Sequence, residues 1–486
     1  MTHTATGDHR RRPALAAAFA WHPLPCLLLI AGAAAGQPGR LPPFRARPPP
    51  PPPPRQPPPP GQGAPGVEAA GLGPQGSGGK RVLVVSSVGP RRKSGSGVRE
   101  FIFVMDLQEC GYAVDLLNAE RVDPGAPLHL EFGWQTETAR EVFGGVRRFN
   151  DSARLDLEPY DEIFFFGWLW EHRFFWEPQH SLLPRLEALG RRATLMLDDV
   201  PTVRCVVEHD TFEKGYCKRA VPELLARWAN VSRRVITLTE ADARATLEAM
   251  QRYGIPAPGP VMAWPLRLRH LTRLRAEEAA GVNKTLDRKY LTMVANDHNV
   301  NDDFLAQFFA SGVIERLCAG GAVLVFVGAI GDFVNFVRPL FPHVGKDCLY
   351  TEGLLSGMAL ERFVMPKTLA MLNPYFEDLG TGISVKSYEA LAAAMPVVTS
   401  VHGLRGLEGC GATSAGVVLP PKDADDPDAY ARFVEGRVLN ATEYPKLVDQ
   451  VRRLRADCVS MQERVFPPSA FPLLLHGPRD VQAQSQ

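Results

Sequence analysis

The sequence predicts an α/β protein made of two units, each a parallel β-sheet covered by helices. Short apolar, β-branched runs alternate with segments of helical spacing over residues 80–265, and the same alternation restarts at residue 289. This alternation is typical of βαβ units, whose parallel strands are buried on both faces. The 486 residues are enough for two such domains. We therefore expect two doubly wound sheets facing each other across a cleft at the carboxyl ends of their strands.

The first unit is expected to open with a buried strand, a glycine-rich loop and a helix. RVLVVSS, residues 81–87, is the strand, and the loop GPRRKSGSG leads into a helix over residues 98–112. Further strands are expected within residues 113–118, 160–170, 193–200 and 233–239, and helices within residues 180–192, 221–232 and 240–254.

The second unit is expected to repeat this order after a charged, proline-punctuated linker, residues 266–288. Strands are expected within residues 289–296, 322–331, 348–353, 363–375, 395–401 and 415–421. Helices are expected over residues 302–321, 332–345, 384–394 and 443–465. The predicted C-terminal domain is thus 289–470, followed by a tail, 471–486.

The N-terminal residues 1–36 have the pattern of a targeting segment. Three arginines at positions 10–12 precede an apolar stretch that ends in small residues, which is typical of a signal peptide. The length also nearly suits a membrane anchor, and a plastid transit peptide is a third reading. Residues 37–79, rich in proline and glycine, are expected to form an extended spacer without a core.

The overall charge gives no support to a nucleic-acid partner, and the sequons favour a secretory protein. The 54 basic and 53 acidic residues nearly cancel, so bulk charge gives no argument for a nucleic-acid partner. Sequons for N-glycosylation occur at Asn150, Asn230, Asn283 and Asn440. We expect a glycoprotein of the Golgi or endoplasmic-reticulum lumen, or a secreted one, with the plastid as the alternative.

The cysteines are scattered and predict no disulfide framework. Cys205 and Cys217 are spaced to close one loop in an oxidising lumen. No Cys-x-x-Cys or Cys/His cluster suggests zinc.

The stretch GTGISVKSYEALAAAMPVVTS, residues 380–400, carries the most informative chemistry. A helix is expected to begin near Ser384, so the backbone N–H groups of residues 382–384 point out of its N-terminus and suit a phosphate. Lys386 adds a mobile positive charge. Glu389 lies on the same face and is able to accept hydrogen bonds from a ribose diol. The alternative is an ordinary surface ion pair between Lys386 and Glu389 beside a glycine turn.

The segment PYFEDLGTGISVKSYEALAAAMPVVTSVHGLRGL resembles the donor-site signature of group 1 glycosyltransferases of the GT-B fold. The resemblance covers about the last 180 residues well, with Asn301 in its usual place, and the N-terminal half more loosely. It implies transfer of a sugar from a nucleotide sugar with retention of configuration, without an essential metal or other cofactor. The implied partners are a nucleotide-sugar donor and a glycan, protein or lipid acceptor, with no nucleic acid.

The resemblance also assigns roles to residues. Glu389 is implied to hold the donor ribose, and Lys386 with the amides of Gly382 and Ile383 the diphosphate. The first glycine-rich loop is implied to close on the phosphates or the reacting sugar. The candidate donor-binding residues are Ser94, Gly95, Ser96, Gly97, Gly380, Thr381, Gly382, Ile383, Lys386 and Glu389.

Two departures from the family pattern affect this assignment. Thr381 stands where many relatives have a second glutamate, the residue to which a contact with the sugar hydroxyls is usually assigned. Many relatives also have an arginine and a lysine after the first strand of the C-terminal domain, whereas residues 290–315 contain neither. Phosphate charge is then expected from Lys386, with Arg91, Arg92 or Lys93 supplied across the cleft.

Catalytic candidates lie at the end of a strand in the first unit. In MLDDVPTVRCVVEH, Asp198 and Asp199 are placed to orient the acceptor hydroxyl, and His209 to assist. The plainer reading is that Asp199 caps a turn and His209 is an exposed loop residue. The aspartate pair lacks the spacing of an Asp-x-Asp metal site. Trp168, Trp170 and Trp176 are candidates for stacking on an acceptor sugar or, more simply, core residues.

Three other functions are weighed against this assignment. A dinucleotide oxidoreductase needs Gly-x-Gly-x-x-Gly directly after a strand, and KSGSGVRE lacks the third glycine. A catalytically degenerate binding protein of the same fold fits the two departures. A nucleotide-sugar 2-epimerase shares the donor site but releases epimerised donor without an acceptor.

Overall fold

The computed structural model describes residues 80–470 with internal gaps. The segments left out of the description are 87–88, 93, 119–125, 151, 153–154, 167–181, 190–192, 201–215, 281–289, 296–298, 343, 346, 356–358, 376–381 and 412–425. The predicted leader, spacer and tail therefore lie outside the described residues. The same holds for the strand expected within residues 415–421.

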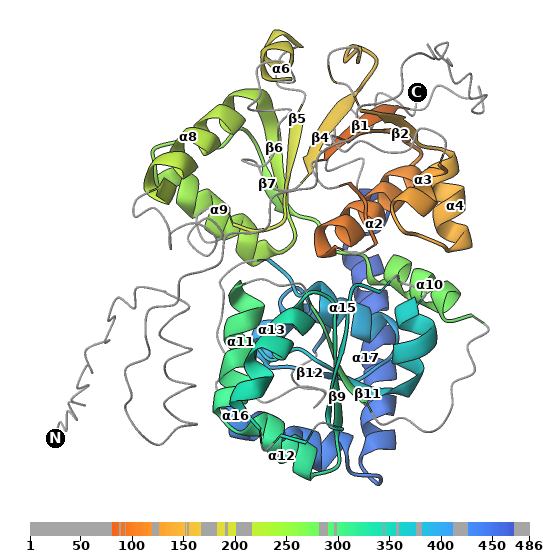
Figure 1. The fold of residues 1–486 in the computed structure, drawn as a ribbon. Coiled ribbons are helices and arrows are strands. Elements are labelled where there is room, and N and C mark those ends of the chain that lie inside the picture. The colour runs from red at the N-terminus through yellow and green to blue at the C-terminus, as the bar shows by residue number, and fades with distance from the viewer. Residues whose placement is uncertain are drawn as a thin grey trace, which may run out of the picture.

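The first domain is built on a seven-stranded sheet in which every paired strand runs parallel to its neighbours (Figure 1). The strand order is β3-β2-β1-β4-β5-β6-β7. The strands are β1 (Arg81–Ser86), β2 (Ala113–Asn118), β3 (Arg147–Phe149), β4 (Glu162–Phe166), β5 (Ala193–Leu197), β6 (Ser232–Thr237) and β7 (Val261–Ala263). The short edge strands β3 and β7 were not expected from the sequence.

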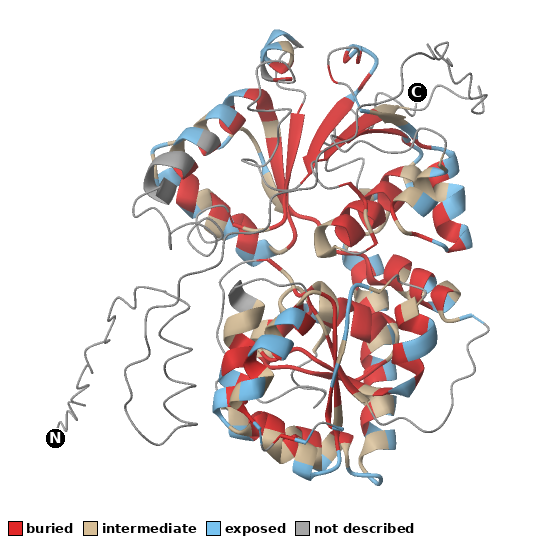
Figure 2. Ribbon diagram, viewed as in Figure 1, coloured by how far each residue is buried: buried red, intermediate tan, exposed pale blue. Residues whose placement is uncertain are grey.

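Helices cover this sheet and turn their apolar sides toward it (Figure 2). They are α2 (Gly95–Glu109), α3 (Leu128–Glu131), α4 (Glu137–Gly144), α6 (Leu183–Leu189), α8 (Tyr216–Val231) and α9 (Glu240–Arg252). The strands β1, β4 and β5 are almost fully buried, as expected for parallel strands covered on both faces.

The second domain has a five-stranded parallel sheet of order β10-β9-β8-β11-β12. Its strands are β8 (Tyr290–Val294), β9 (Val323–Val327), β10 (Leu349–Glu352), β11 (Thr368–Leu372) and β12 (Val397–Val398). Its helices are α11 (Asn299–Ala310), α12 (Val313–Ala319), α13 (Ile330–Val337), α15 (Val385–Ala392), α16 (Pro427–Phe433) and α17 (Tyr444–Val465). Single helical turns are η1 (Arg338–Leu340), η2 (Leu360–Val364), η3 (Met365–Lys367), η4 (Val401–Leu404), η5 (Glu408–Cys410) and η7 (Val434–Val438).

One helix expected from the sequence is two. The segment 302–321 was predicted as a single helix, but the structure divides it into α11 and α12 at Gly312. Gly312 has a φ of +73°, in the left-handed region that glycine adopts readily. The glycine ends the first helix and lets the second one start in a new direction.

Each sheet reverses its winding direction next to its first strand. In the first sheet β1 lies between β2 and β4, and in the second β8 lies between β9 and β11. Ligands of doubly wound sheets bind outside the carboxyl ends of the strands at this switch point. The helix α2 follows β1 there, and α15 follows β11.

The two domains share one hydrophobic core cluster. It runs from β1 and α2 through Trp264, Leu268 and Leu274 to the strands and helices of the second domain. Much of this bridge belongs to α10 (Leu268–Glu278), which lies at the waist of the molecule beside the upper end of α17 (Figure 1). The predicted linker thus contains a helix packed against both domains.

Two disulfides stabilise the second domain. They join Cys318 to Cys348 and Cys410 to Cys458, with Cα–Cα distances of 5.6 and 4.9 Å. The prediction of no disulfide framework is wrong for these four cysteines, because the fold brings together residues that are distant in sequence. Cys205 and the Cys217 side chain lie outside the description.

No helix among the described residues, which exclude the predicted leader, is long and apolar enough to cross a membrane.

Candidate active site

The glycine-rich starts of α2 and α15 meet across the domain boundary. Ser94 is the N-cap of α2, and its Oγ accepts a hydrogen bond of 2.9 Å from the N–H of Gly97. A Cβ atom on Gly95 would lie 3.4 Å from Cγ2 of Val385, the first residue of α15. Both helices present their positive ends here, which favours an anion. The two loops that the sequence assigned to the donor are therefore brought together.

Two features favour glycine at position 382. Its φ of +68° lies in the left-handed region, and a Cβ atom there would lie 2.0 Å from Oδ1 of Asp199 in the first domain. Ser384 is the N-cap residue of α15, so the helix begins where the sequence predicted. Ile383 is half-buried against the core. Gly380 and Thr381 lie outside the described residues.

Lys386 is half-buried beside neutral groups. Its Nζ donates a 2.8 Å hydrogen bond to Oδ1 of Asn301 and lies 5.8 Å from the ring centre of Tyr375. Desolvation by burial lowers the pKa of Lys386 to about 8. The ammonium group therefore loses its proton closer to neutral pH than that of an exposed lysine.

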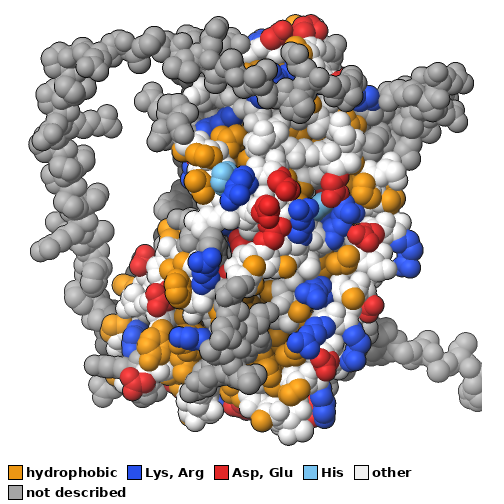
Figure 3. All heavy atoms as spheres, turned by 90° about the vertical axis from the view of Figure 1, so that its right-hand side faces the viewer, with side chains coloured by type: hydrophobic (Ala, Val, Ile, Leu, Met, Phe, Trp, Pro, Cys, Tyr) orange, Lys and Arg blue, Asp and Glu red, His pale blue; other side chains and the backbone are white. Residues whose placement is uncertain are grey.

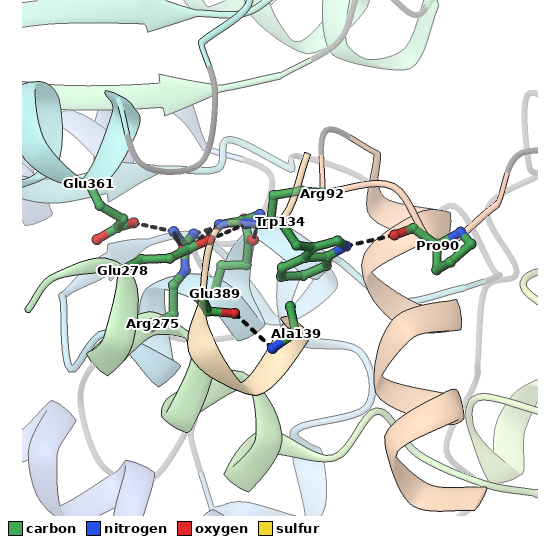
Figure 4. A network of polar contacts seen from close by, with 9 residues as sticks. Pro90, Arg92, Trp134, Ala139, Arg275, Glu278, Glu361 and Glu389 are labelled. Carbon is green, nitrogen blue, oxygen red and sulfur yellow. Dashed lines mark hydrogen bonds and ion pairs between the residues drawn. The ribbon is translucent and has the colours of Figure 1, made fainter. Parts of the chain in front are cut away.

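Glu389 lies in a buried cluster of five charged side chains, which we call the interdomain charge cluster (Figure 4). Oε1 of Glu389 is 2.7 Å from Nη1 of Arg92, and Oε2 is 3.1 Å from Nη2 of Arg275. The cluster consists of Arg92 from the β1–α2 loop, Arg275 and Glu278 from α10, Glu361 from η2, and Glu389 from α15.

Arg92 is the member of the interdomain charge cluster that comes from the first domain. It binds Glu278 with two hydrogen bonds, of 2.7 Å from Nε and 3.0 Å from Nη2. Its guanidinium lies 5.3 Å from the ring centre of Trp134, whose Nε1 donates to the carbonyl of Pro90 (Figure 4). Burial alone would lower the pKa of Arg92, but Glu278 and Glu389 outweigh it and raise that pKa. The loop that carries Arg92 is thereby fixed against the second domain.

The acids of the interdomain charge cluster respond differently to burial. Desolvation would raise the pKa of Glu278, but Arg92 and Arg275 lower it. Desolvation by burial raises the pKa of Glu361 despite its ion pair with Arg275. The cluster has two arginines and three glutamates, so one negative charge is not balanced. Glu361, whose pKa is raised, favours its neutral form more than an exposed glutamate does.

The reading of Lys386 and Glu389 as an ordinary surface ion pair does not fit this arrangement. Glu389 is only 8% exposed and its described partners are Arg92 and Arg275, while Lys386 donates to Asn301. Arg92 does cross the domain boundary as expected, but it binds carboxylates. Arg91 is half-buried in the same loop, and Lys93 lies outside the description.

Asp198 and Asp199 lie at the end of β5, close to the start of α15. Asp198 is 3% exposed and forms a 2.8 Å ion pair with Arg99 of α2. Oδ1 of Asp199 lies beside Gly382. The structure therefore brings both aspartates to the same edge as the donor candidates. His209, Trp168, Trp170 and Trp176 lie outside the described residues.

Glu100, which the sequence analysis did not single out, supports the β1–α2 loop. Ser86 donates a 2.5 Å hydrogen bond to Oε2 of Glu100, and the N–H of Gly89 donates to Oγ of Ser86. Burial raises the pKa of Glu100 to about 8, with Asp198 adding to the rise. Burial thus favours the neutral form of this glutamate behind the loop.

Asp242 and Arg405 were also missed. Asp242, on α9, forms a 2.9 Å ion pair with Nη2 of Arg405. It also accepts a 3.3 Å hydrogen bond from the N–H of Gly382. Burial raises the pKa of Asp242 despite these contacts. The sequence signals were weak: Asp242 resembles an ordinary capping residue after Thr239, and Arg405 lies in the loop that follows β12.

Within the described part of the chain, one group of side chains has the spacing of metal ligands. Asp106, Glu109 and His270 lie where α2 meets α10, away from the starts of α2 and α15. Asp106 already accepts a 2.9 Å hydrogen bond from Nε1 of Trp264, and Glu109 pairs with Arg269. Together with the 3.0 Å contact between His270 and Asp106, these bonds describe a polar contact between helices.

The outer face of the waist is charged. Figure 3 shows acidic and basic side chains gathered at mid-height on this face. Ion pairs of α10 with the first domain, such as Arg269–Glu109 and Arg273–Glu141, belong to this level of the fold. These pairs are more exposed to water than the interdomain charge cluster, so each contributes less to the contact between the domains.

A cavity of about 280 Å³ lies at the other end of α15 from its N-terminus. Arg275 and Glu361 line it, together with residues 392–395 and the face of α17 near Arg455. The cavity thus adjoins the interdomain charge cluster on the side away from the glycine-rich loops.

Comparison with known proteins identifies the fold. No protein-family model and no curated protein matches the sequence. The OtsA apo structure matches with a TM-score of 0.50 at 14% identity, covering 82% of this chain and 99% of that chain. A trehalose-6-phosphate structure from E. coli, bound with UDP-2-fluoro glucose, matches with a TM-score of 0.50 at 13% identity and the same coverage. At these identities the likeness establishes the fold, which is the expected GT-B arrangement of two doubly wound domains.

Removing Arg92 should destabilise the protein strongly. The variant Arg92→Ala leaves Glu278 and Glu389 buried with one arginine between them, and breaking a buried ion pair costs about 3–5 kcal/mol. The exposed Arg452, which pairs with Asp449 on α17, is the matched control, and Arg452→Ala should cost less than about 1 kcal/mol. Calorimetric unfolding of both variants makes the comparison, and equal losses would contradict the assigned role of the cluster.

Proposed function

We propose that the chain is a retaining glycosyltransferase that moves a sugar from a nucleotide-sugar donor to a glycan, protein or lipid acceptor. The observation that carries this proposal is the meeting of two glycine-rich helix starts with Lys386 and Glu389 at the junction of two GT-B domains. A ligand with a diphosphate and a ribose diol matches this set of groups. The UDP-2-fluoro glucose bound in the E. coli relative of this fold supports the same donor class.

The chemistry follows from where negative charge collects. As the glycosidic bond breaks, charge builds up on the oxygen that links the sugar to the leaving diphosphate. The converging ends of α2 and α15 and the ammonium of Lys386 would stabilise this charge more in the transition state than in the bound donor. Asp198 and Asp199, beside Gly382, would orient the acceptor. No metal or other cofactor is part of the proposal.

One observation favours a second candidate, a binding protein of the same fold without transfer activity. Glu389 already binds Arg92 and Arg275, and the amide of Gly382 already donates to Asp242. A donor must replace or share these contacts. Activity therefore depends on the free energy needed to displace these contacts within the chain.

A panel of nucleoside diphosphates and nucleotide sugars tests the proposal. One nucleotide sugar should bind, and incubation with acceptors should release its nucleoside diphosphate with the anomeric configuration of the product retained. Binding without transfer or hydrolysis would favour the binding protein, and release of epimerised free donor would indicate an epimerase. Absence of any binding would contradict both the enzyme and the binding protein.

Glu389→Gln should weaken the nucleoside diphosphate and the donor alike. Loss of a charged hydrogen-bond acceptor costs roughly 1.5–3 kcal/mol, or about 10- to 150-fold in affinity. Glu361→Gln is the matched control, because Glu361 belongs to the same cluster but is not a candidate ribose ligand. Calorimetric titration of both folded variants should show the loss only in Glu389→Gln, and equal affinities would remove Glu389 from the donor site.

Lys386 should make donor binding depend on pH. A bound diphosphate favours the charged lysine and raises its pKa, so above about pH 8 binding requires uptake of a proton and affinity falls. Lys386→Arg stays charged and should show a flat profile from pH 7 to 9.5. Lys386→Ala should also lower kcat, with a combined loss on the order of 10²-fold. A wild-type profile as flat as that of Lys386→Arg would contradict the role.

We also propose that the protein resides in the secretory pathway. Asn150 and Asn440 are exposed, and the two disulfides suit an oxidising compartment. Peptide mapping of protein expressed with its leader should find glycans on at least one sequon and cross-links joining Cys318 to Cys348 and Cys410 to Cys458. Reduced, unglycosylated protein in the cytosol or plastid would contradict this localisation.

A further inference from the structure

A carboxylate of the first domain is bound by a backbone amide and a guanidinium of the second. Oδ1 of Asp242 accepts from the N–H of Gly382 at 3.3 Å and from Nη2 of Arg405 at 2.9 Å. Asp242 is 1% exposed, so these contacts are shielded from water. The contact joins α9 to the loop just before α15 and to the loop after β12.

The two donors are held in place independently of Asp242. Nε of Arg405 donates a 3.1 Å hydrogen bond to the carbonyl of Gly382, which ties the guanidinium to the same peptide segment. A backbone N–H and a guanidinium side by side form a two-donor cradle for a charged oxygen. The side chain of Arg405 is 14% exposed, so the cradle lies close to the surface of the domain contact.

Asp242 is held on its own side by one residue. Oγ1 of Thr239 donates a 2.8 Å hydrogen bond to Oδ2 of Asp242 and accepts a 3.0 Å bond from its N–H. Oδ2 is therefore satisfied within α9, and only Oδ1 reaches across the boundary. If the domains separate slightly, Asp242 keeps its local partner while the cradle is vacated.

Arg405 also supplies a charge that the sequence pattern lacked. Residues 290–315 contain no arginine or lysine, although the resemblance to group 1 glycosyltransferases leads one to expect both there. The cradle lies directly before α15, and Lys386 is in the first turn of that helix. A diphosphate bound by Lys386 would therefore lie at the same end of α15 as the cradle.

We propose that Arg405 and the Gly382 amide form a diphosphate-binding subsite, and that Asp242 fills it as an internal competitor in the donor-free protein. The proposal rests on the proposed function for the identity of the anion. Donor binding would expel Asp242 and break the contact of α9 with the second domain. The apparent affinity for the diphosphate then equals the intrinsic affinity multiplied by the fraction of molecules in which Asp242 does not fill the cradle.

Pyrophosphate is the first probe, because it carries the anion without base or sugar, and the nucleoside diphosphate selected by the panel is the second. Asp242→Asn removes the competing charge and should tighten binding of both probes at least threefold. Arg405→Ala should weaken both at least tenfold, and in the double variant the gain from Asp242→Asn should disappear. Asp242→Ala replaces Asp242→Asn if the latter does not fold.

Matched controls remove one charge of the same sign from an exposed position. Glu240→Gln takes one negative charge from the first turn of α9, where Glu240 is exposed, and Arg453→Ala takes one positive charge from an exposed position of α17. Both should bind the probes within twofold of wild type. Affinities of Asp242→Asn and Arg405→Ala that match these controls would overturn the inference.

The failure of the inference and that of the proposed function are distinguishable. If wild type transfers a sugar while the Asp242 and Arg405 variants bind normally, only the subsite is wrong. If pyrophosphate follows the predicted pattern while no nucleotide sugar binds or reacts, the subsite is correct and the proposed function is wrong. If wild type binds neither probe at millimolar concentration, both are wrong.

Discussion

The relative position of the two domains depends on the buried interdomain charge cluster. Arg92 from the first domain, Arg275 and Glu278 from α10, and Glu361 and Glu389 from the second domain form ion pairs with one another away from water. Such a cluster adds little net stability compared with a hydrophobic core, but loss of one member leaves an unpaired buried charge. Its main effect is therefore to specify one arrangement of the domains. Because Glu389 is also the candidate ribose ligand, domain arrangement and donor binding share a residue.

The contact of Asp242 with Gly382 and Arg405 also joins the two domains through groups of the candidate donor site. The amide of Gly382 and the guanidinium of Arg405 bind a carboxylate of the chain itself, as Glu389 binds arginines of the chain itself. A donor would exchange these partners for its phosphate and hydroxyl oxygens. The net free energy of such an exchange is smaller than that of the new hydrogen bonds alone. Affinity and domain opening are thus expected to be linked in this protein.

The sequence predicted those features that local pattern determines. The alternation of strands and helices predicted two domains, each with a parallel sheet. The glycine turn and Ser384 predicted where α15 begins. The partners of Glu389 and Gly382 were not predictable, because Arg92 and Asp242 are 297 and 140 residues away from them in sequence. The disulfide between Cys318 and Cys348 likewise depends on β9 and β10 being neighbours. The break at Gly312 was visible as a glycine but not as a change of helix direction.

The central claim is that a nucleoside diphosphate binds at the start of α15 by replacing contacts made by the chain itself. A crystal structure with the tightest-binding nucleoside diphosphate tests this most directly. We expect ribose hydroxyls on the carboxylate of Glu389, a phosphate beside Lys386 and the Gly382 amide, and Asp242 displaced from Arg405. A nucleotide bound elsewhere, with the contacts of Glu389 and Asp242 unchanged, would contradict it.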